Sequence, residues 1–255
     1  AELGRRIDVH YRNANLRVRV AQSFLQRMLP PPEPVAERVD EIIQGAYTTG
    51  CSETLTELDV RLVPSPDCWR IGLVAKGQVA TETQSNTGPA TFFSRGNANF
   101  EAAKEVVIHR FGWYHRAAVA EAESCSELAD VTTRLDPVPL VGDLARAIAI
   151  GRFRAETPAA EREVKHRVTA TASDRIDTEV SCRLNALQQR FREDFYLPLH
   201  QLALNPLVVD MQTTESCLAG RYRLAGHGQL AAHTPRGIAP AGSVFQLQIH
   251  ESALN

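Results

Sequence analysis

The longest uninterrupted segment of the chain runs from Pro158 to Tyr196 and contains no internal glycine or proline. Its apolar residues recur at steps of four, once of three, which is the spacing of one helix face: Val164, Val168, Ala172, Ile176, Val180, Leu184, Leu187, Phe191 and Phe195. The segment predicts one helix of about 39 residues and about 58 Å, with Thr157 as its N-cap and Pro158 in its first turn. A compact domain of 255 residues is about 47 Å across. We therefore expect an elongated body.

The residues before this helix predict long antiparallel strands. Residues 55–63 and 69–84 alternate apolar and polar side chains, and the second run would span about 50 Å if unbroken. Further strands are expected over 90–102 and 104–122, so residues 52–120 form a meander. Since the longest strand and the helix have similar lengths, the sequence predicts an α+β fold. In this fold a long, curved antiparallel sheet packs on one very long helix, with shorter helices beside it.

Two short helices are predicted outside these elements. Residues 16–29 carry apolar side chains at helical spacing, and the prolines from Pro30 onward stop the helix. A second apolar helix is expected over 140–151, ending near a glycine. Residues 35–50 predict either a short helix or the start of a strand.

The remaining segments predict one loop and a second set of strands. The acidic segment 121–130 contains no basic residue and is expected to be a solvated loop. After Pro198 the period of two returns, which predicts strands over 202–211, 217–226 and 243–250.

The order of these elements suggests a single elongated domain, residues 1–255, with two related halves. The halves, 16–120 and 158–250, each join a helix to strands, and WRIGLVAKG at 69–77 shares its spacing with LAGRYRLAG at 218–226. This layout resembles the tubular lipid-binding superfamily over most of the chain, without a shared motif. The resemblance implies a long helix wrapped by a highly curved sheet around an apolar groove for acyl chains. The chain departs from it in having one very long helix in the second half and a short one in the first.

The charge balance argues against nucleic acid as a partner. The chain has 28 basic and 30 acidic residues and a formal net charge of -2, so it offers no general attraction for phosphate backbones. The first thirty residues are locally basic through six arginines: Arg5, Arg6, Arg12, Arg17, Arg19 and Arg27. These arginines form either a solvated face or a contact with acidic lipid or a protein partner.

The cysteines do not predict a metal site. Five cysteines are widely spaced without a C-x-x-C motif: Cys51, Cys68, Cys125, Cys182 and Cys217. We expect buried free thiols, and the alternative is a bridge between Cys51 and Cys68. No apolar run approaches the 18 residues of a membrane span, although peripheral membrane contact stays open. A periplasmic or secreted location is expected if an export signal was removed before Ala1.

No catalytic signature is found, and the sequence favours a protein that is not an enzyme and holds no cofactor or metal. His109 and His115 flank FGWY, which predicts a strand pair with aromatic packing. Residues 85–96 lack both phosphate-binding glycine patterns and predict a hairpin. The remaining enzyme hypothesis places a site among the histidines after residue 196: His200, His227, His233 and His250.

The favoured function is non-enzymatic binding of a lipid or other apolar ligand in a groove between the long helix and the curved sheet. A long apolar helix stripe facing long half-apolar strands can enclose a dry groove without polar chemistry. The expected lining residues are Val168, Ile176, Val180, Leu184, Leu187 and Phe191 on the helix, facing Ile71, Leu73, Val79 and Phe92 on the strands. The alternative is a structural or assembly module with a filled core that docks a protein partner.

Overall fold

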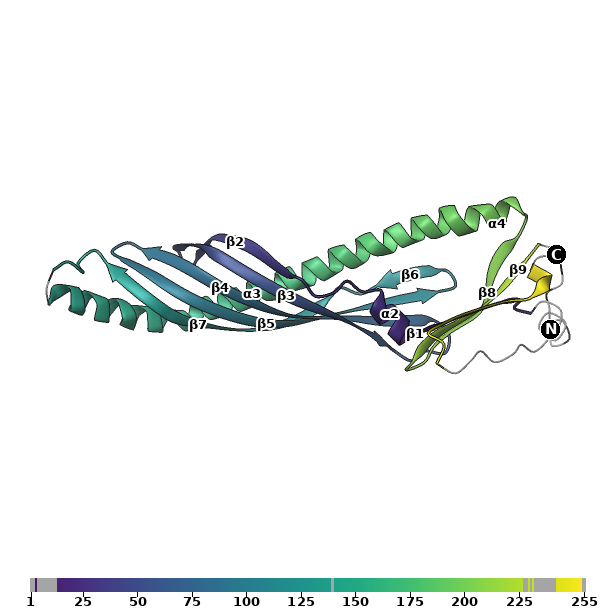
Figure 1. The fold of residues 1–255 in the computed structure, drawn as a ribbon, viewed down its shortest axis with the longest axis horizontal. Helices are drawn as coiled ribbons and strands as arrows, with labels where there is room; N and C mark the ends of the chain where they lie inside the picture. The colour runs from purple at the N-terminus through teal and green to yellow at the C-terminus, as the bar shows by residue number, and fades with distance from the viewer. Residues whose placement is uncertain are drawn as a thin grey trace.

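The computed structural model describes residues 3, 13–138, 140–226, 229, 231 and 242–253. The molecule is elongated (Figure 1). A curled antiparallel sheet, or half-barrel, lies along one very long helix, and a smaller sheet lies at one end of the molecule. The predicted α+β class and the elongated shape are confirmed.

The large sheet is built from strands of unusual length. Its order is β2-β3-β4-β5-β6, and β7 also pairs with β5. The strands are β2 (Pro34–Ile43), β3 (Ala46–Leu62), β4 (Trp69–Thr87), β5 (Ala90–His109), β6 (Gly112–His115) and β7 (Val119–Thr133). Strands β4 and β5 have 19 and 20 residues, against a usual length of about five or six. All pairs are antiparallel, as predicted for the meander.

The acidic segment 121–130, expected to be a loop, is instead part of β7. Its glutamates alternate along the strand, so Glu121 and Glu123 are exposed to solvent while Ala122 between them is 3% exposed. A strand with one solvated face tolerates such a row of acids. The segment is predicted to be a loop from its net charge, although its side chains alternate between exposed and buried or half-buried positions as in a strand.

Two other segments of the large sheet differ from expectation in their boundaries. Residues 35–50 form β2, a turn and the start of β3, which confirms the strand alternative and not the helix. The turn residues Gln44 and Gly45 have φ of 49° and 77°, as a tight hairpin requires. The strands expected at 90–102 and 104–122 are β5, β6 and the start of β7, because β5 runs on to His109 before it turns.

The helix is longer than predicted. Helix α3 (Val141–Arg190), a π-helical turn η1 (Phe191–Tyr196) and α4 (Leu197–Gln201) form one helix of 61 residues, about 90 Å long (Figure 1). The segment expected as a separate helix at 140–151 is the beginning of α3, which continues through Gly151 without a break.

The predicted N-terminus of the long helix at Thr157 and Pro158 is wrong, since Pro158 lies inside α3. The Thr157 hydroxyl donates to the carbonyl of Phe153 at 2.8 Å instead of capping a helix end. A proline in a helix interior removes one backbone hydrogen bond. We attribute its tolerance to contacts on both sides of it: Phe153 packs in a cluster with residues of β5 and β7, and Glu161 is hydrogen-bonded to Ser124 and Ser126 of β7.

The side chain of Asp136 links the end of β7 to the start of α3 through hydrogen bonds. Its carboxylate accepts hydrogen bonds from the Thr133 hydroxyl at 2.6 Å, from the Thr133 backbone N–H at 3.1 Å and from Arg146 at 3.0 Å. These contacts, those of Thr133 first, lower the pKa of Asp136 from 3.8 to about 2. A carboxylate with a lowered pKa stabilises the folded state above its unfolded pKa. That contribution is lost as the pH falls from about 4 towards 2.

We expect the side-chain carboxyl of Asp136 to titrate with a midpoint near pH 2 when followed by NMR. In a Thr133→Val variant, which removes the hydroxyl donor, the midpoint should move upward towards 3.8. A midpoint near 4 in the unchanged protein would show that the turn is not formed in solution.

The small sheet joins the two ends of the described chain. Its order is β10-β1-β9-β8, and its strands are β1 (Leu16–Ala21), β8 (Asn205–Thr213), β9 (Cys217–Ala225) and β10 (Phe245–Ile249). The short helices α2 (Gln22–Arg27) and η2 (Glu251–Ala253) flank it. The three strands predicted after Pro198 are confirmed. The suggested relation between the halves 16–120 and 158–250 stays a prediction.

The helix predicted over 16–29 is wrong for its first half. Residues 16–21 form β1, in which Leu16, Val18 and Val20 alternate with two arginines and pair with both β9 and β10. Helix α2 begins at Gln22, directly after the last residue of this strand. Among the described residues, no helix is long and apolar enough to cross a membrane.

Candidate functional site

The face of the large sheet that packs against α3 is called the inner face below. Directly opposed residues of antiparallel strands share a face, so Thr54, Val79, Ala98 and Ser124 form one row across four strands. The inner positions in the middle of the strands are uncharged and mostly small: Ser52, Thr54, Thr56, Gly77, Val79, Thr81, Gly96, Ala98, Phe100, Ala122, Ser124 and Ser126. The opposite face carries charged side chains: Glu53, Lys76, Glu82, Arg95, Glu101 and Glu123.

Two packed hydrophobic clusters lie at different places along the large sheet. The first joins the sheet to the beginning of α3 and comprises Ala90, Phe92, Val131 and Ala149, with Leu128, Ile150 and Phe153 against them. The second joins the large sheet to the small one and comprises Val60, Leu62 and Leu218, with Val20, Leu25, Leu29, Trp69, Ile71 and Leu73 against them. Both clusters hold the molecule together at contacts between elements.

Between the two clusters the inner face is buried at its smallest residues, Ala98 and Ala122 among them, and half-buried at its larger ones. Val79 and Thr81 on β4 and Thr56 on β3 all keep part of their surface exposed, although they point to the helix side of the sheet. On the helix, Val168 and Ile176 are also half-buried. None of these residues belongs to either packed cluster. The larger side chains in the middle of the inner face therefore keep part of their surface uncovered.

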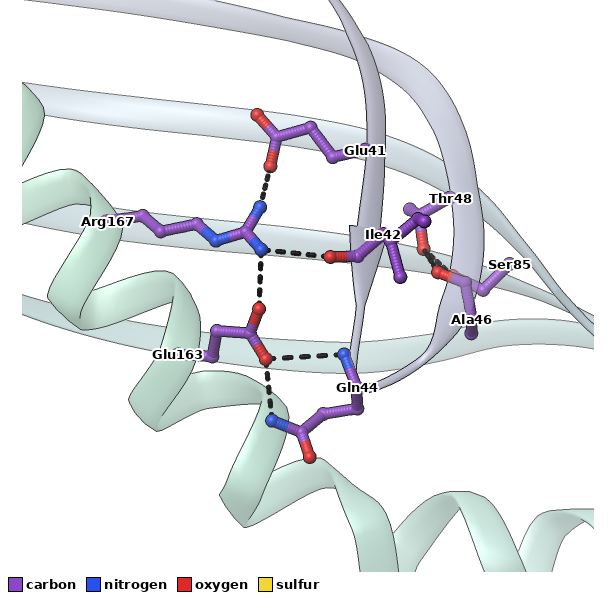
Figure 2. Close-up of polar contacts among 8 residues, drawn as sticks. All are labelled: Glu41, Ile42, Gln44, Ala46, Thr48, Ser85, Glu163 and Arg167. Carbon is purple, nitrogen blue, oxygen red and sulfur yellow. Dashed lines mark hydrogen bonds and ion pairs between the residues drawn. The ribbon is translucent and has the colours of Figure 1, made fainter.

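Polar contacts fasten α3 to the β2 edge of the sheet (Figure 2). Arg167 pairs with Glu41 and donates to the Ile42 carbonyl at 2.9 Å, while its other partner is Glu163 at 2.5 Å. Glu163 also accepts from the side chain of Gln44 at 2.6 Å. Burial alone would raise the pKa of Glu163, but the hydrogen bonds from Gln44 and the charge of Arg167 outweigh it and lower that pKa.

The same helix is fastened to the other edge of the sheet by a second set of polar contacts. The Ser124 hydroxyl donates to the backbone carbonyl of Glu161 at 2.9 Å, and the carboxylate of Glu161 accepts from the backbone N–H of Ser126 at 2.9 Å. Further along, Trp113 of β6 donates to Gln188 at 3.2 Å. Helix α3 therefore spans the curled sheet from edge to edge, held by hydrogen bonds and ion pairs on both sides.

The most buried of these contacts is the ion pair between Lys104 and Asp177. The side chain of Lys104 is 0% exposed and that of Asp177 is 34% exposed. Lys104 also donates to the carbonyl of Arg116 at 3.1 Å, and Asp177 accepts from the N–H of Ala118 at 2.9 Å. Burial opposes ionisation of Asp177, but the hydrogen bonds from Lys104 and Ala118 outweigh it and lower its pKa. The pair thus stabilises the fold above the ordinary pKa of an aspartate, and the effect is lost as the pH falls below it.

A serine and a histidine meet beside this ion pair. His115 Nε2 lies 3.3 Å from the Ser181 hydroxyl, and its ring stacks on Trp113 with centroids 5.7 Å apart. The serine donates to the carbonyl of Asp177 at 2.6 Å, and the buried His115 Nδ1 has no hydrogen-bond partner in the described part of the chain. A catalytic triad needs a third group that orients the histidine. The geometry favours structural packing, and the predicted strand pair around FGWY is confirmed as the β5–β6 hairpin.

The structure distributes the predicted strand-side lining residues over three places. Phe92 is 5% exposed in the first packed cluster. Ile71 and Leu73 pack against the second cluster. Val79 lies between the clusters in the half-buried middle. All four occupy the inner face, as their shared register requires.

The predicted helix-side residues separate along the length of the helix. Val168 and Ile176 are half-buried opposite the middle of the sheet, Val180 is 9% exposed, and Leu184 is half-buried. By contrast, Leu187 and Phe191 are 59% and 56% exposed. Gln188, next to Leu187, still accepts a hydrogen bond from Trp113 of β6, so the helix stays beside the end of the sheet while these two side chains face solvent. The structure therefore does not bring these last two residues onto the inner face.

The histidine hypothesis is only partly placed by the structure. His227 and His233 lie outside the described residues. His200 lies near Tyr196, with ring centroids 6.1 Å apart, and His250 contacts Ser252 at 3.1 Å. Within the described ranges, no group of three or more His, Cys, Asp or Glu residues is arranged to hold a metal ion.

All five cysteines are free. The expectation that they are buried holds for Cys217 alone, since Cys68 is half-buried and three others are exposed: Cys51, Cys125 and Cys182. The exposed thiols lie on strand and helix positions that face solvent, where a small polarisable side chain causes no packing conflict.

Sequence reasoning missed the polar contacts that position the helix. Lys104 could have been noticed in the sequence. Every second residue of β5 lies on the inner face, and Lys104 is a charged residue in that otherwise uncharged row. A lysine on a buried strand face requires a partner. Its partner Asp177 lies on α3, 73 residues away in the sequence, so no local pattern connects the two residues.

Comparisons with known proteins leave the family undefined. No family model and no curated protein matches the chain. Among solved structures, the chain is similar to a protein described as "Crystal structure of lipopolysaccharide binding protein", with 10% identity and a TM-score of 0.32. The similarity covers 93% of this chain and 57% of that one, so the chain spans little more than half the length of its structural neighbour. A likeness of this level defines neither a family nor an activity.

Proposed function

We propose that the protein binds a lipid or another elongated apolar ligand between α3 and the inner face of the large sheet, without catalysis. The observation that carries the proposal is the uncharged middle of the inner face, where Val79, Thr81 and Thr56 stay half-buried between two packed clusters and beside a helix that is held at both edges. Apolar surface left in contact with water gains about 25 cal/mol per Å² when a ligand covers it. The arrangement therefore favours an occupant.

The shape and chemistry of this region suit an extended ligand. Its rows follow strands β3, β4 and β5, of 17, 19 and 20 residues, so the surface is much longer than it is wide. Lys104, which is charged, is neutralised by Asp177. An acyl chain needs no hydrogen bonds along such a surface.

The proposed lining consists of Val79 on β4 with Val168 and Ile176 on α3. Phe92 would bound it at one end, and Ile71 and Leu73 at the other. Val180 and Leu184 continue the same helix stripe towards β6. Leu187 and Phe191, which are exposed, are not part of the proposed lining. A periplasmic or secreted location is a prediction from the sequence that accompanies this proposal.

The test is titration of the purified protein with a fluorescent fatty acid, followed by displacement with the unlabelled acid. We expect saturable uptake that the unlabelled acid reverses. Uptake that rises linearly with probe concentration and is not displaced would contradict the proposal.

The alternative function, a module that docks a protein partner, is favoured by a different observation. Strand β10 is an edge of the small sheet, and Phe245, Leu247 and Ile249 on it are 46%, 52% and 50% exposed. An exposed apolar edge strand can accept a further strand from a partner. This alternative predicts a filled inner face, and hence no uptake of fatty acid.

A further inference from the structure

The small sheet carries arginines on one face. In its register, Arg17 of β1 lies directly opposite Arg221 of β9. Successive residues of a strand alternate between faces, so two further arginines share that face, one on each strand. The four are named the arginine face: Arg17, Arg19, Arg221 and Arg223.

The charges of three residues of this face, Arg17, Arg19 and Arg221, are not balanced by ion pairs within the described part of the chain. Like charges directly opposite each other destabilise a strand pair. Arg19 donates to the Cys217 sulfur at 3.1 Å, and Arg221 donates to the side-chain oxygen of Asn13 at 2.9 Å, both neutral acceptors. Asp210 lies opposite Arg221 in register. Among the described residues, however, none of Arg17, Arg19 and Arg221 forms an ion pair with a carboxylate.

The guanidinium groups of Arg17 and Arg221 each contain a buried N–H donor that has no acceptor among the described residues. The Nε atoms of Arg17 and Arg221 are buried and have no hydrogen-bond partner in the part of the chain that the structure describes. A buried donor without a partner costs about 1–3 kcal/mol. The remainder of each side chain is half-buried, and Arg19 is exposed, so the cluster is reachable from solvent.

We infer that the arginine face binds a phosphate group, either as free phosphate or in the head group of an anionic lipid. Phosphate oxygens accept two parallel hydrogen bonds from one guanidinium, and two charges on one phosphate offset the repulsion between opposed arginines. The inference concerns the small sheet and does not depend on the function proposed for the inner face.

The first test measures thermal unfolding of the full chain in inorganic phosphate and in sodium chloride of equal ionic strength. We expect phosphate, and not chloride, to raise Tm by about 5 °C at concentrations far above the dissociation constant. In the Arg17→Gln/Arg221→Gln variant this rise should be lost, since each lost charged hydrogen bond weakens affinity by about tenfold or more. Arg154→Gln, which removes an exposed arginine from α3, should keep the rise.

The second test distinguishes the two sources of the phosphate. It measures co-sedimentation with phosphatidylcholine vesicles that contain or lack phosphatidylglycerol. Binding to phosphatidylglycerol vesicles that the double variant loses supports a lipid head group, and a phosphate-dependent rise in Tm without vesicle binding supports free phosphate. Neither response, or responses that survive in the double variant, would overturn the inference.

Two measurements keep the result interpretable. If the double variant does not fold, the single Arg19→Gln variant, at an exposed position, should still weaken the phosphate response. Uptake of fatty acid at the inner face should be unchanged in these variants, so failure of the arginine face and failure of the proposed function give different results.

Discussion

Replacing Asp177 with alanine is expected to lower the free energy of unfolding by about 3 kcal/mol. The replacement leaves the ammonium group of Lys104, whose side chain is 0% exposed, with the backbone carbonyl of Arg116 as its remaining acceptor. An uncompensated buried charge costs about 3–5 kcal/mol. We expect the lower end of this range because Asp177 is 34% exposed, so water already weakens part of the attraction. Urea unfolding at neutral pH measures the change.

The matched control removes both charges. A Lys104→Met/Asp177→Leu variant leaves no buried charge, and its stability should lie within about 1 kcal/mol of the unchanged protein, because apolar residues replace buried ion pairs at little cost. A loss below about 1 kcal/mol in Asp177→Ala would mean that the ion pair does not hold α3 to the sheet in solution.

The second large effect concerns the inner face. Replacing Val79 with aspartate is expected to weaken binding of a fluorescent fatty acid at least about tenfold, because an acyl chain over this position would strip water from a carboxylate. Val79 is half-buried and belongs to neither packed cluster. The fold should therefore tolerate the change better than it would in a packed core.

The neighbouring residue supplies the control for this variant. Ala80 lies on the same strand, faces the other way and is exposed. Its replacement by aspartate adds the same charge and should leave fatty-acid affinity unchanged. If Val79→Asp and Ala80→Asp bind the probe equally well, the ligand does not lie on the inner face.

The sequence allowed much of the fold to be predicted where one period ran without interruption. The four-residue steps from Val164 to Phe195 identified the helix, and the two-residue alternation around Val60 and Leu73 identified the long strands. The prediction failed where two periods overlapped. In 16–29, Val20 and the apolar residues after it have helical spacing, but the preceding residues alternate with arginines, and pairing with both β9 and β10 fixes them as a strand.

The candidate site was predictable in part. The residues of the inner face follow from strand alternation, so Val79 and Phe92 could be assigned to one face. The part of the apolar helix stripe that is buried does not follow from its spacing, because Leu187 and Phe191 continue the same spacing but are exposed. The contacts that fix this geometry, such as Arg167 with Glu41, join residues 126 positions apart. Local periodicity carries no information on such distant pairs.

Native mass spectrometry of the purified protein, followed by organic extraction of whatever dissociates, is the decisive measurement of whether an apolar ligand is bound. Binding at the inner face predicts a reproducible adduct with the mass of a lipid or comparable apolar molecule, which is lost after extraction and regained when fatty acid is added. A mass equal to that of the chain alone, with no adduct after fatty acid is added, would contradict binding at the inner face. It would favour the packed module that docks a protein partner.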